Sequence, residues 1–379
     1  MSGPLAGVRV IELAGIGPTP FAGMMLSDLG AEVIRIDRVG GSGNPVASGS
    51  GPMERGKRAI AVDLKSPEGV AVVGDLVAGA DVLLEGFRAG VAERLGVGPD
   101  VCLERNPSLV YARMTGWGQT GPMAQRAGHD INYISLAGPL AHIGRSGAPP
   151  TVPLNLVGDF GGGSVFVVLG IVSALFAVRG GAPGQVVDAA MVDGAAYLLS
   201  PLYSAHASGF WTDERGSNLL DSGAPFYDVY ETSDGGHMAV GAIEPQFYAE
   251  LLDGLGLGAE DLPRQMDRSG WPATKERFAA IFATRTRDDW TAVFADRDAC
   301  VTPVLTMGEA PGHGQAGERD SFFAPCGVVQ PRPAPRFSAT PSEPAMASSQ
   351  PGDDTDAVLA ELGYDDERIA ALRAGSVVA

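Results

Sequence analysis

The chain has 379 residues, of which 45% are hydrophobic and 19% are charged, and its formal net charge at pH 7 is −18. This length indicates about two domains, because one domain typically has roughly 100 to 200 residues. The negative charge argues against nucleic-acid binding, which needs a concentrated basic face. The cysteines at 102, 300 and 326 have neither disulfide nor zinc-site spacing, so we expect a reduced, cytoplasmic protein with no metal site.

Two sequence features bear on membrane association. The first residues contain no basic segment followed by an apolar one, so no signal peptide is expected. The most apolar stretch, Val165–Val178, is shorter than the roughly 20 residues that span a bilayer. We therefore predict a buried core helix there and no membrane span.

Strand and helix patterns alternate through the first part of the chain. β-rich runs at Val8–Leu13 and Glu32–Ile36 flank an apolar helical stretch, and a right-handed crossover makes two such strands parallel. Further strand candidates lie at residues 60–62, 82–84 and 109–112, with helical windows between them at 67–77 and 91–95. The pattern predicts an α/β fold with an open, mostly parallel, Rossmann-like sheet. Such sheets bind ligands beyond the carboxyl ends of their strands.

The segment Gly15–Pro20, which follows the first strand, carries part of a dinucleotide-binding fingerprint. Proline replaces its third glycine, and Arg38 directly follows Asp37, the acidic residue that would bind the ribose. A nicotinamide site is therefore disfavoured. A tight strand-to-helix turn with proline in the first helical turn accounts for the same residues.

A change of composition divides the chain after its first half. A strand leads into a helix over Gln185–Gly194, and residues 209–223, rich in Gly, Asp, Ser and Asn, indicate a linker. Residues 224–318 contain aromatic-rich strands and several helical windows, which indicate a smaller α+β domain. We expect the large domain to comprise residues 1–208.

The last part of the chain is expected to return to the large domain. Proline, serine and acidic residues dominate residues 330–353 and indicate an extended surface arm. Apolar residues recur at helical spacing over residues 354–373. Residues 319–379 therefore form, in this interpretation, a return arm and C-terminal helices that pack with the large domain.

His129 and Asp159 are candidates for proton transfer. Each lies in a segment with glycine, where backbone approaches a ligand closely, and an imidazole with a carboxylate is what a two-base site needs. The alternatives are structural: His129 orders a loop, and Asp159 caps the helix that follows. Glu244 precedes a proline of N1 type, so for it too a structural role at a helix start stays open.

Four cations, Arg38, Lys65, Arg88 and Arg94, follow predicted strand ends. Isolated surface cations are usually only solvated. Four of them near the ligand-binding edge of one sheet could instead bind a polyphosphate. The chain has no Gly-Lys-Ser/Thr phosphate loop, so such binding would depend on side chains.

Residues 6–14, 28–37 and 112–122, together with the His129 segment and residues 358–364, resemble the class III coenzyme A transferase family. The resemblance covers nearly the whole chain. Within the family it is similar to the α-methylacyl-coenzyme A racemases, because Gly-His-Asp at His129 and Ala-Ile-Glu-Pro at Glu244 match the racemase pattern. The glycine-rich loop that shields the transferase intermediate is not apparent near Gly241.

The resemblance implies a racemase that interconverts (2R)- and (2S)-2-methylacyl-coenzyme A in the degradation of branched-chain fatty acids or sterol side chains. His129 and Asp159 would be the two bases of a 1,1-proton transfer through an enolate. Glu244 would orient His129, and the backbone N–H of Asp130 is our candidate donor to the enolate oxygen. Coenzyme A enters as part of the substrate, so no cofactor is expected.

The family's coenzyme A site and quaternary structure are also implied. Its members form interlocked homodimers, with each site between the large domain of one chain and the small domain of its partner. Glu244 would then approach the partner's His129. The residues that match the coenzyme A site are Arg38, Val62, Asp63, Leu64, Lys65, Gly86, Phe87, Arg88, Arg94, Gly128, Asp130, Ile131, Asn132 and Tyr133.

Two alternative functions are considered. A class III acyl-coenzyme A transferase would use Asp159 as the nucleophile and carry the acyl group as a mixed anhydride. An inactive acyl-coenzyme A binding protein would need only the phosphate contacts. Intact His129, Asp159 and Glu244 argue against the second alternative.

Overall fold

The computed structural model describes residues 2–41, 51–345 and 347–379. The chain forms two compact units. Unit 1 comprises Met1–Ala137, Leu154–Leu198 and Asp320–Ala379, and unit 2 comprises Gly138–Pro153 and Leu199–Arg319. Residues 138–153 and 199–208, which the sequence suggested for the large domain, thus belong to the smaller unit.

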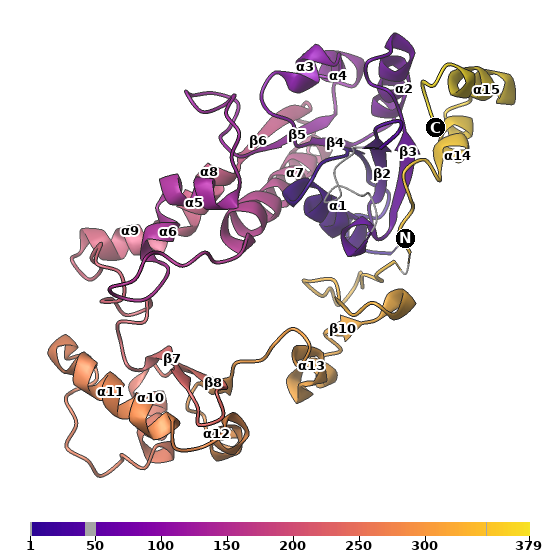
Figure 1. The fold of residues 1–379 in the computed structure, drawn as a ribbon. Coiled ribbons are helices and arrows are strands. Elements are labelled where there is room, and N and C mark those ends of the chain that lie inside the picture. Colours follow the sequence, from indigo (N-terminus) through magenta and orange to yellow (C-terminus); the bar gives the residue numbers. More distant parts are fainter. Residues whose placement is uncertain (1, 42–50, 346) are drawn as a thin grey trace. The chain divides into compact units, whose positions relative to one another are not determined.

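A six-stranded parallel sheet forms the centre of unit 1, which confirms the predicted open α/β sheet (Figure 1). The order β3-β2-β1-β4-β5-β6 reverses direction between β1 and β4, and ligands of open sheets bind beside such a switch point. The strands are β1 (Arg9–Leu13), β2 (Glu32–Asp37), β3 (Lys57–Ala61), β4 (Val82–Glu85), β5 (Val110–Thr115) and β6 (Gln185–Ala190).

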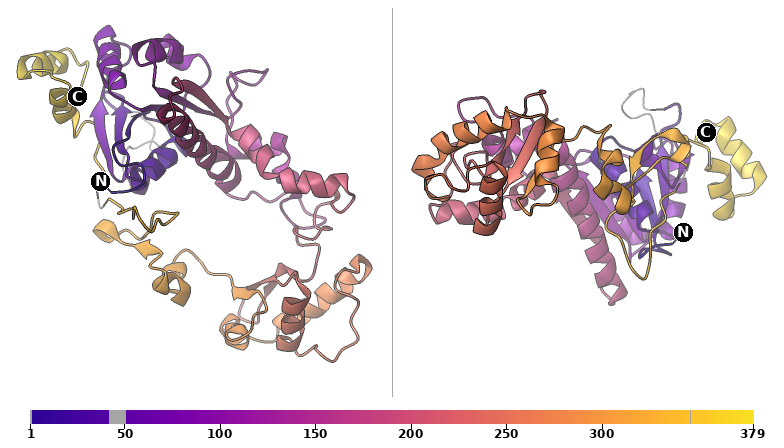
Figure 2. Two further views of the ribbon diagram at one scale, coloured as in Figure 1. Left: turned by 180° about the vertical axis from the view of Figure 1, so that it is seen from behind. Right: turned by 90° about the horizontal axis from the view of Figure 1, so that it is seen from below.

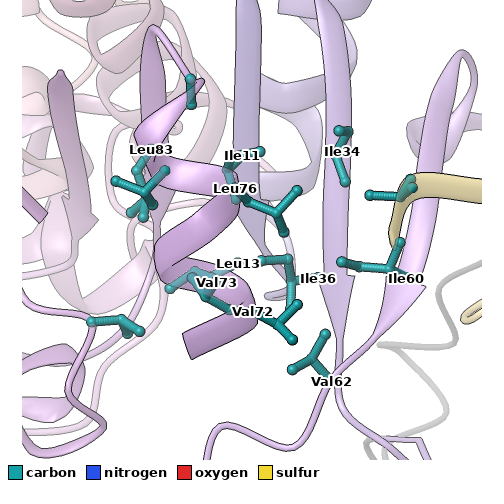
Figure 3. Close-up of a cluster of buried hydrophobic side chains, with 14 of the residues drawn as sticks. Ile11, Leu13, Ile34, Ile36, Ile60, Val62, Val72, Val73, Leu76 and Leu83 are labelled. Atoms are coloured by element: carbon teal, nitrogen blue, oxygen red, sulfur yellow. The ribbon is translucent and has the colours of Figure 1, made fainter. Parts of the chain in front are cut away.

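Helices cover both faces of this sheet. The face that carries Ile11 and Leu13 packs on Val72, Val73 and Leu76 of α2 (Figure 3). Val10, one residue before Ile11, belongs to the cluster of the opposite face, as the alternation of a strand requires. The first face is covered by α2 (Pro67–Ala78), α3 (Val91–Arg94), α4 (Pro99–Arg105), α14 (Thr355–Glu361) and α15 (Asp366–Ala374). The second is covered by α1 (Pro18–Asp28), α5 (Asp130–Ala137), α7 (Val165–Arg179) and α8 (Met191–Leu198).

The helix expected at 165–178 begins earlier than predicted. A π-helical segment, η3 (Leu156–Ser164), runs into α7, so the helix is continuous over Leu156–Arg179, 24 residues that are long and apolar enough to cross a membrane. Val167 and Ile171 are buried against the sheet, so the helix is part of the core of unit 1. In the described ranges it alone passes this test of length and apolarity.

The C-terminal residues complete the edge of the sheet beside β3. Val378 pairs with Val62, the N–H of Asp63 donates to the carbonyl of Val377 at 2.8 Å, and the hydroxyl of Thr355 accepts the N–H of Ala61 at 3.2 Å. That hydroxyl also donates to the carbonyl of Ala379 at 2.6 Å. The last residues of the chain therefore hold the turn that follows β3, and α14 and α15 lie beside it (Figures 1 and 2).

Unit 2 is an α+β structure with an aromatic core. One face of its antiparallel sheet packs on helices through Tyr230, Phe278 and Phe282, while the other face exposes Tyr227 and Val229. The strands are β7 (Tyr227–Glu231), β8 (His237–Gly241) and β9 (Val301–Pro303). The helices of four or more residues are α6 (Pro139–His142), α9 (Ser200–Ala207), α10 (Pro245–Gly254), α11 (Trp271–Phe282), α12 (Arg287–Phe294) and α13 (Gly314–Glu318).

A short antiparallel pair marks the return of the chain to unit 1. It consists of β10 (Phe322–Phe323) and β11 (Gln330–Pro331), and Gln330 is buried, accepting a hydrogen bond from Arg55 at 3.1 Å. The segment predicted as an extended surface arm thus begins with a packed residue. The described residues that follow it up to α14 are mostly irregular.

Candidate active site

The turn before α5 presents His129 to solvent. The backbone carbonyl of His129 accepts the N–H groups of Asn132, at 2.8 Å, and Tyr133, at 3.2 Å, so His129 stands at the start of the helix. Its own N–H donates to the side-chain oxygen of Asn132 at 3.1 Å. These reciprocal bonds fix the backbone of His129 and leave its imidazole exposed.

An aromatic pair packs against this turn on its buried side. Trp117 and Tyr133 make an edge-to-face contact with ring centroids 4.8 Å apart, and the Tyr133 hydroxyl donates to the carbonyl of Gly128. A Cβ at Gly116 would overlap the Tyr133 ring, so only glycine fits there. Burial raises the pKa of Tyr133 to about 12, and the charges of Asp159 and Asp130 act in the same direction. Tyr133, a predicted coenzyme A contact, therefore has its side chain under the turn.

Asp159 lies in the first turn of η3 and not before it. The capping alternative is therefore wrong, because the helix begins at Leu156. The amide of Asn155, one helical turn earlier, donates to Asp159 Oδ2 at 3.1 Å. This i to i+4 spacing is a signal that the sequence offered, although Asn155 was not among the predicted site residues.

The structure brings the environments of His129 and Asp159 together. Burial raises the pKa of Asp159; the hydrogen bond from Asn155 opposes this, the charge of Asp130 adds to it, and the charge of His129 lowers it. A raised pKa suits a carboxyl that must both take and return a proton near neutral pH.

The site lies at the carboxyl end of β1, beside the switch point of the sheet. A Cβ built on Gly17, in the turn between β1 and α1, would lie 3.6 Å from Asp159 Oδ2. Gly17 has φ of 65°, a conformation that favours glycine. The partial fingerprint thus forms the predicted strand-to-helix turn, and this turn forms one wall of the site.

The four predicted phosphate-binding cations are exposed on unit 1. Arg38 follows β2, Lys65 lies in the turn after β3, and Arg88 follows β4, so three of them follow the carboxyl ends of parallel strands of one sheet. Arg94 ends α3. Among the described residues, none of these four side chains has a hydrogen bond or ion pair within the chain, so all four remain available to an anionic ligand.

The remaining predicted contacts of coenzyme A form the turns that carry these cations. Asp63 arranges its turn by accepting the N–H of Lys65 at 3.1 Å. Val62 is buried in the core, where Leu64 also packs. A Cβ at Gly86 would overlap the hydroxyl of Thr19, so α1 approaches the end of β4 closely. Of the other predicted contacts, Phe87 and Gly128 are half-buried, whereas Ile131 is exposed.

Glu244 belongs to unit 2 and is exposed at the start of α10. Glu244 is the N-cap residue of α10, and Pro245 follows in the first turn, as the structural alternative expected. Its carbonyl accepts the N–H of Tyr248 at 3.0 Å, but its side chain caps no N–H and stays free. The amide of Gln265 donates to the carbonyls of Ala242, at 3.1 Å, and Ile243, at 2.7 Å, and so holds the segment that leads to Glu244. Sequence reasoning missed Gln265, which lies 21 residues beyond Glu244.

No group of three or more His, Cys, Asp or Glu side chains that could hold a metal ion occurs within residues 2–41, 51–345 and 347–379. That the protein needs no metal or cofactor for its activity remains a prediction.

Comparison with known proteins gives the same family throughout. A family profile described as CoA-transferase family III matches residues 5–355. The chain is 50% identical to the alpha-methylacyl-CoA racemase of Mus musculus over 376 residues, 99% of this chain and 97% of that protein, and 46% identical to the Homo sapiens enzyme of the same name over the same shares. It is 27% identical to the succinyl-CoA:glutarate CoA-transferase of Homo sapiens, over 99% of this chain and 90% of that one.

Solved structures agree with these sequence relatives. A CAIB/BAIF family protein from Brucella suis superposes with a TM-score of 0.82 at 28% identity, over 96% of this chain and 100% of that one. Rv3272 from M. tuberculosis superposes with a TM-score of 0.76 at 26% identity, over 94% of this chain and 99% of that one.

Proposed function

Because this chain belongs to CoA-transferase family III, we propose that it is an α-methylacyl-coenzyme A racemase. The observation that carries the proposal is geometric: Asp130, the neighbour of His129 in the chain, accepts the N–H of Asp159 at 2.8 Å, so the segments of the two bases meet in one site. The identity to two racemases over 99% of the chain supports it. The substrate would be a 2-methylacyl thioester of coenzyme A, of the kind that arises in degradation of branched-chain fatty acids or sterol side chains.

The proposed reaction is a 1,1-proton transfer. One base removes the proton from the carbon next to the thioester, and the electron pair moves to the carbonyl oxygen to form an enolate. The conjugate acid of the other base returns a proton to the opposite face, so the substrate gains and loses one proton. His129 and Asp159 are the two bases, and each turnover leaves their protonation states exchanged.

The enolate oxygen needs donors that are already in place. Asp130 begins α5, and the N–H groups of a first helical turn have no acceptor within the helix. The backbone N–H of Asp130 is our candidate donor, and the dipole of α5 favours negative charge at this end. Removing one such donor costs about 2.7 to 4 kcal/mol of transition-state stabilisation in other enzymes.

Coenzyme A would bind at the cationic edge of the sheet. Arg38, Lys65, Arg88 and Arg94 supply positive charge on a chain whose net charge is −18. Since coenzyme A arrives with the acyl group, no separate cofactor is part of the proposal. The free thiols of Cys102 and Cys300 are consistent with a cytoplasmic site of action.

A homodimer is part of the proposal because α7 exposes an apolar stripe. Val165, Leu169, Val172 and Phe176 recur at spacings of four, three and four residues, and the Phe176 side chain is 80% exposed. An exposed apolar stripe of this kind indicates an interaction surface. We propose that a second copy of the chain covers it, with the partner's Glu244 orienting His129.

Sedimentation of a Phe176→Asp variant tests the dimer. We expect the wild type to sediment as a dimer and the variant as a monomer with little racemase activity, because the aspartate would lose hydration on burial. Val101→Asp is the matched control, since Val101 is an exposed apolar residue of α4 outside the stripe. A wild type that sediments as a monomer would contradict this part of the proposal.

Proton NMR in deuterium oxide tests the reaction itself. The purified protein is incubated with (2R)-2-methylacyl-coenzyme A and, separately, with the (2S) epimer. We expect the α-proton signal to disappear and the configuration to change from either side, and both changes to be lost in His129→Ala and Asp159→Asn. His313→Ala and Asp296→Asn, exposed residues of unit 2, serve as matched controls.

The same experiment separates the main alternative. Asp159 also suits a nucleophile that attacks the thioester, and the chain is similar to transferases of the family. Absence of α-proton exchange from both epimers, with transfer of coenzyme A to an added carboxylate, would establish the transferase and reject the racemase.

A further inference from the structure

The carboxylate of Asp130 joins the two proposed bases. Asp130 follows His129 directly in the chain, and its Oδ2 accepts the N–H of Gly158 at 2.6 Å and the N–H of Asp159 at 2.8 Å. The residue is 4% exposed. One side chain is thus attached to the backbone of the first base and hydrogen-bonded to the backbone of the second.

This link depends on close packing between α5 and η3. A Cβ on Gly158 would lie 2.7 Å from Asp130 Oδ2 and 3.0 Å from its Cγ, which real Cβ atoms do not tolerate. Gly158 therefore has to be glycine for the carboxylate to reach both N–H groups. Glycine at position 158 is therefore explained by the space that the Asp130 carboxylate occupies, and not only by chain flexibility.

The other oxygen of Asp130 has no use in the fold. Oδ1 is buried, and no donor in the described part of the chain reaches it. A buried acceptor without a partner costs about 1 to 3 kcal/mol. Oδ2 satisfies two N–H groups in the first turn of η3, whereas Oδ1 adds no hydrogen bond to the fold, so stability alone accounts for only half of this carboxylate.

We propose that Asp130 is a positioning residue whose carboxylate fixes the separation of His129 and Asp159 for proton transfer across the two faces of the substrate. This inference rests on the proposed racemase function. It also reassigns Asp130, since its carboxylate points inward to η3 and only its backbone N–H is left for the thioester.

The charge of Asp130 has a second effect on the site. It contributes to the raised pKa of Asp159, after burial and against the hydrogen bond from Asn155 and the charge of His129. The phenol of Tyr133 also interacts with Asp159. Removing the negative charge of Asp130 should therefore lower the pKa of Asp159 while these other groups keep their places.

Two variants test the proposal on the full-length protein. Asp130→Ala removes both hydrogen bonds, and we expect kcat to fall by about 10²-fold with KM changed less than threefold, because misplacement of a catalytic group by about 1 Å has that effect. Asp130→Asn keeps an acceptor oxygen at similar volume but removes the charge. It should retain more activity than Asp130→Ala, with the acidic limb of the kcat profile shifted to lower pH.

The ratio of inversion to retention during deuterium incorporation is a readout that general destabilisation of the protein would not change. In deuterium oxide, the Asp130→Ala variant should incorporate deuterium with retention more often, relative to inversion, than the wild type. This is expected because one base can still exchange a proton while the second no longer reaches the opposite face. Asp100→Ala, an exposed carboxylate of α4, is the control.

Three outcomes are distinguishable. A lower ratio of inversion to retention in folded Asp130→Ala, with an unchanged ratio in Asp100→Ala, supports the proposal. An active wild type with an unchanged ratio and kcat within twofold in Asp130→Ala overturns it but leaves the racemase intact. Absence of α-proton exchange in the wild type overturns the proposed function, and this inference with it.

Discussion

Two regions of unit 1 differ in whether their arginines are paired within the protein. Arg35 on β2 is 1% exposed and donates to Asp37 and to Glu54, each at 2.8 Å. Arg38, just after the same strand, is exposed and has no hydrogen bond or ion pair within the described ranges. The first arginine is held by the protein, and the second is left for a ligand.

Lys57 shows how completely the first region is paired. Its Nζ lies 2.9 Å from Glu12 Oε2, 2.9 Å from Glu54 Oε2 and 2.9 Å from the carbonyl of Pro20 in α1. A Cβ on Gly23 of α1 would overlap Glu12, so glycine makes room for the carboxylate. We call Glu12, Arg35, Asp37, Glu54 and Lys57 the buried charge cluster.

Pairing, more than residue type, separates structural charges from functional ones in unit 1. A buried charge without a partner is costly, and in this cluster Arg35 and Lys57 are both paired, although three carboxylates share the two cations. At the carboxyl edge of the sheet, internal partners would compete with phosphates, and in the described residues the cations there have none. Predictions that separate stability from ligand binding follow from this difference.

Lys57→Met should have the largest effect on stability. It leaves Glu12 and Glu54 buried without their shared cation, and we expect the free energy of unfolding to fall by about 3 to 5 kcal/mol. Urea denaturation followed by circular dichroism measures it. Lys65→Met, at the cationic edge, is the matched control and should change the free energy by less than about 0.5 kcal/mol. Equal losses in both variants would contradict the distinction.

Glu12 should make stability depend on pH. Burial raises the pKa of Glu12 from 4.5 to about 7, although Lys57 opposes this shift. Because the folded-state pKa is the higher one, the contribution of Glu12 is complete below pH 4.5 and is lost as the pH rises to about 7. The loss is on the order of 3 kcal/mol. Relative to Glu12→Gln, the wild type should lose stability between pH 5 and 7 in urea titrations; parallel curves would refute the assignment.

Arg88→Ala should affect substrate binding without affecting the fold. We expect KM for the acyl-coenzyme A to rise about tenfold, equivalent to about 1.4 kcal/mol, with kcat and the unfolding midpoint unchanged. The effect should shrink as salt is added, because salt screens exposed charges. Steady-state kinetics at two ionic strengths measures it. Arg264→Ala, an exposed arginine of unit 2, should leave KM unchanged.

Glu361→Gln should have the smallest effect. Arg58 on β3 donates twice to Glu361 of α14, at 2.8 Å in each bond, but the Glu361 side chain is half exposed. Exposed pairs contribute about 0 to 1 kcal/mol, so the free energy of unfolding should fall by less than about 1 kcal/mol. Thermal unfolding with and without added salt measures this, and a loss comparable to that of Lys57→Met would contradict it.

The sequence predicted the sheet well because alternating strands and helices leave few other arrangements. It placed β3 three residues late, since Lys57 and Arg58 resemble an exposed segment. Lys57 is buried only because Glu12, 45 residues away, and Glu54 neutralise it. Pairing between distant residues leaves no local pattern in a sequence.

The site was predicted less completely than the sheet. His129 and Asp159 stood out as a pair by residue type and by their glycine-containing segments, but only the resemblance to a family assigned them a 1,1-proton transfer through an enolate. The glycines that follow Asp159 belong to η3, where Gly162 fits against the backbone of Ala195 in α8, a contact between segments that no local pattern reveals. The contribution of Asp130 depends on the contact between α5 and η3, which only the folded chain reveals.

The closure of β3 by Thr355 and Val378 also orders events during synthesis. All of unit 2 has been made before the residues that complete the edge of the large sheet leave the ribosome. Unit 2 can therefore fold while that edge still exposes unpaired backbone groups, a state that favours aggregation. Thr355 and Val378 can therefore complete the large sheet only after unit 2 has been synthesised, and a chain truncated before Thr355 would leave this edge open.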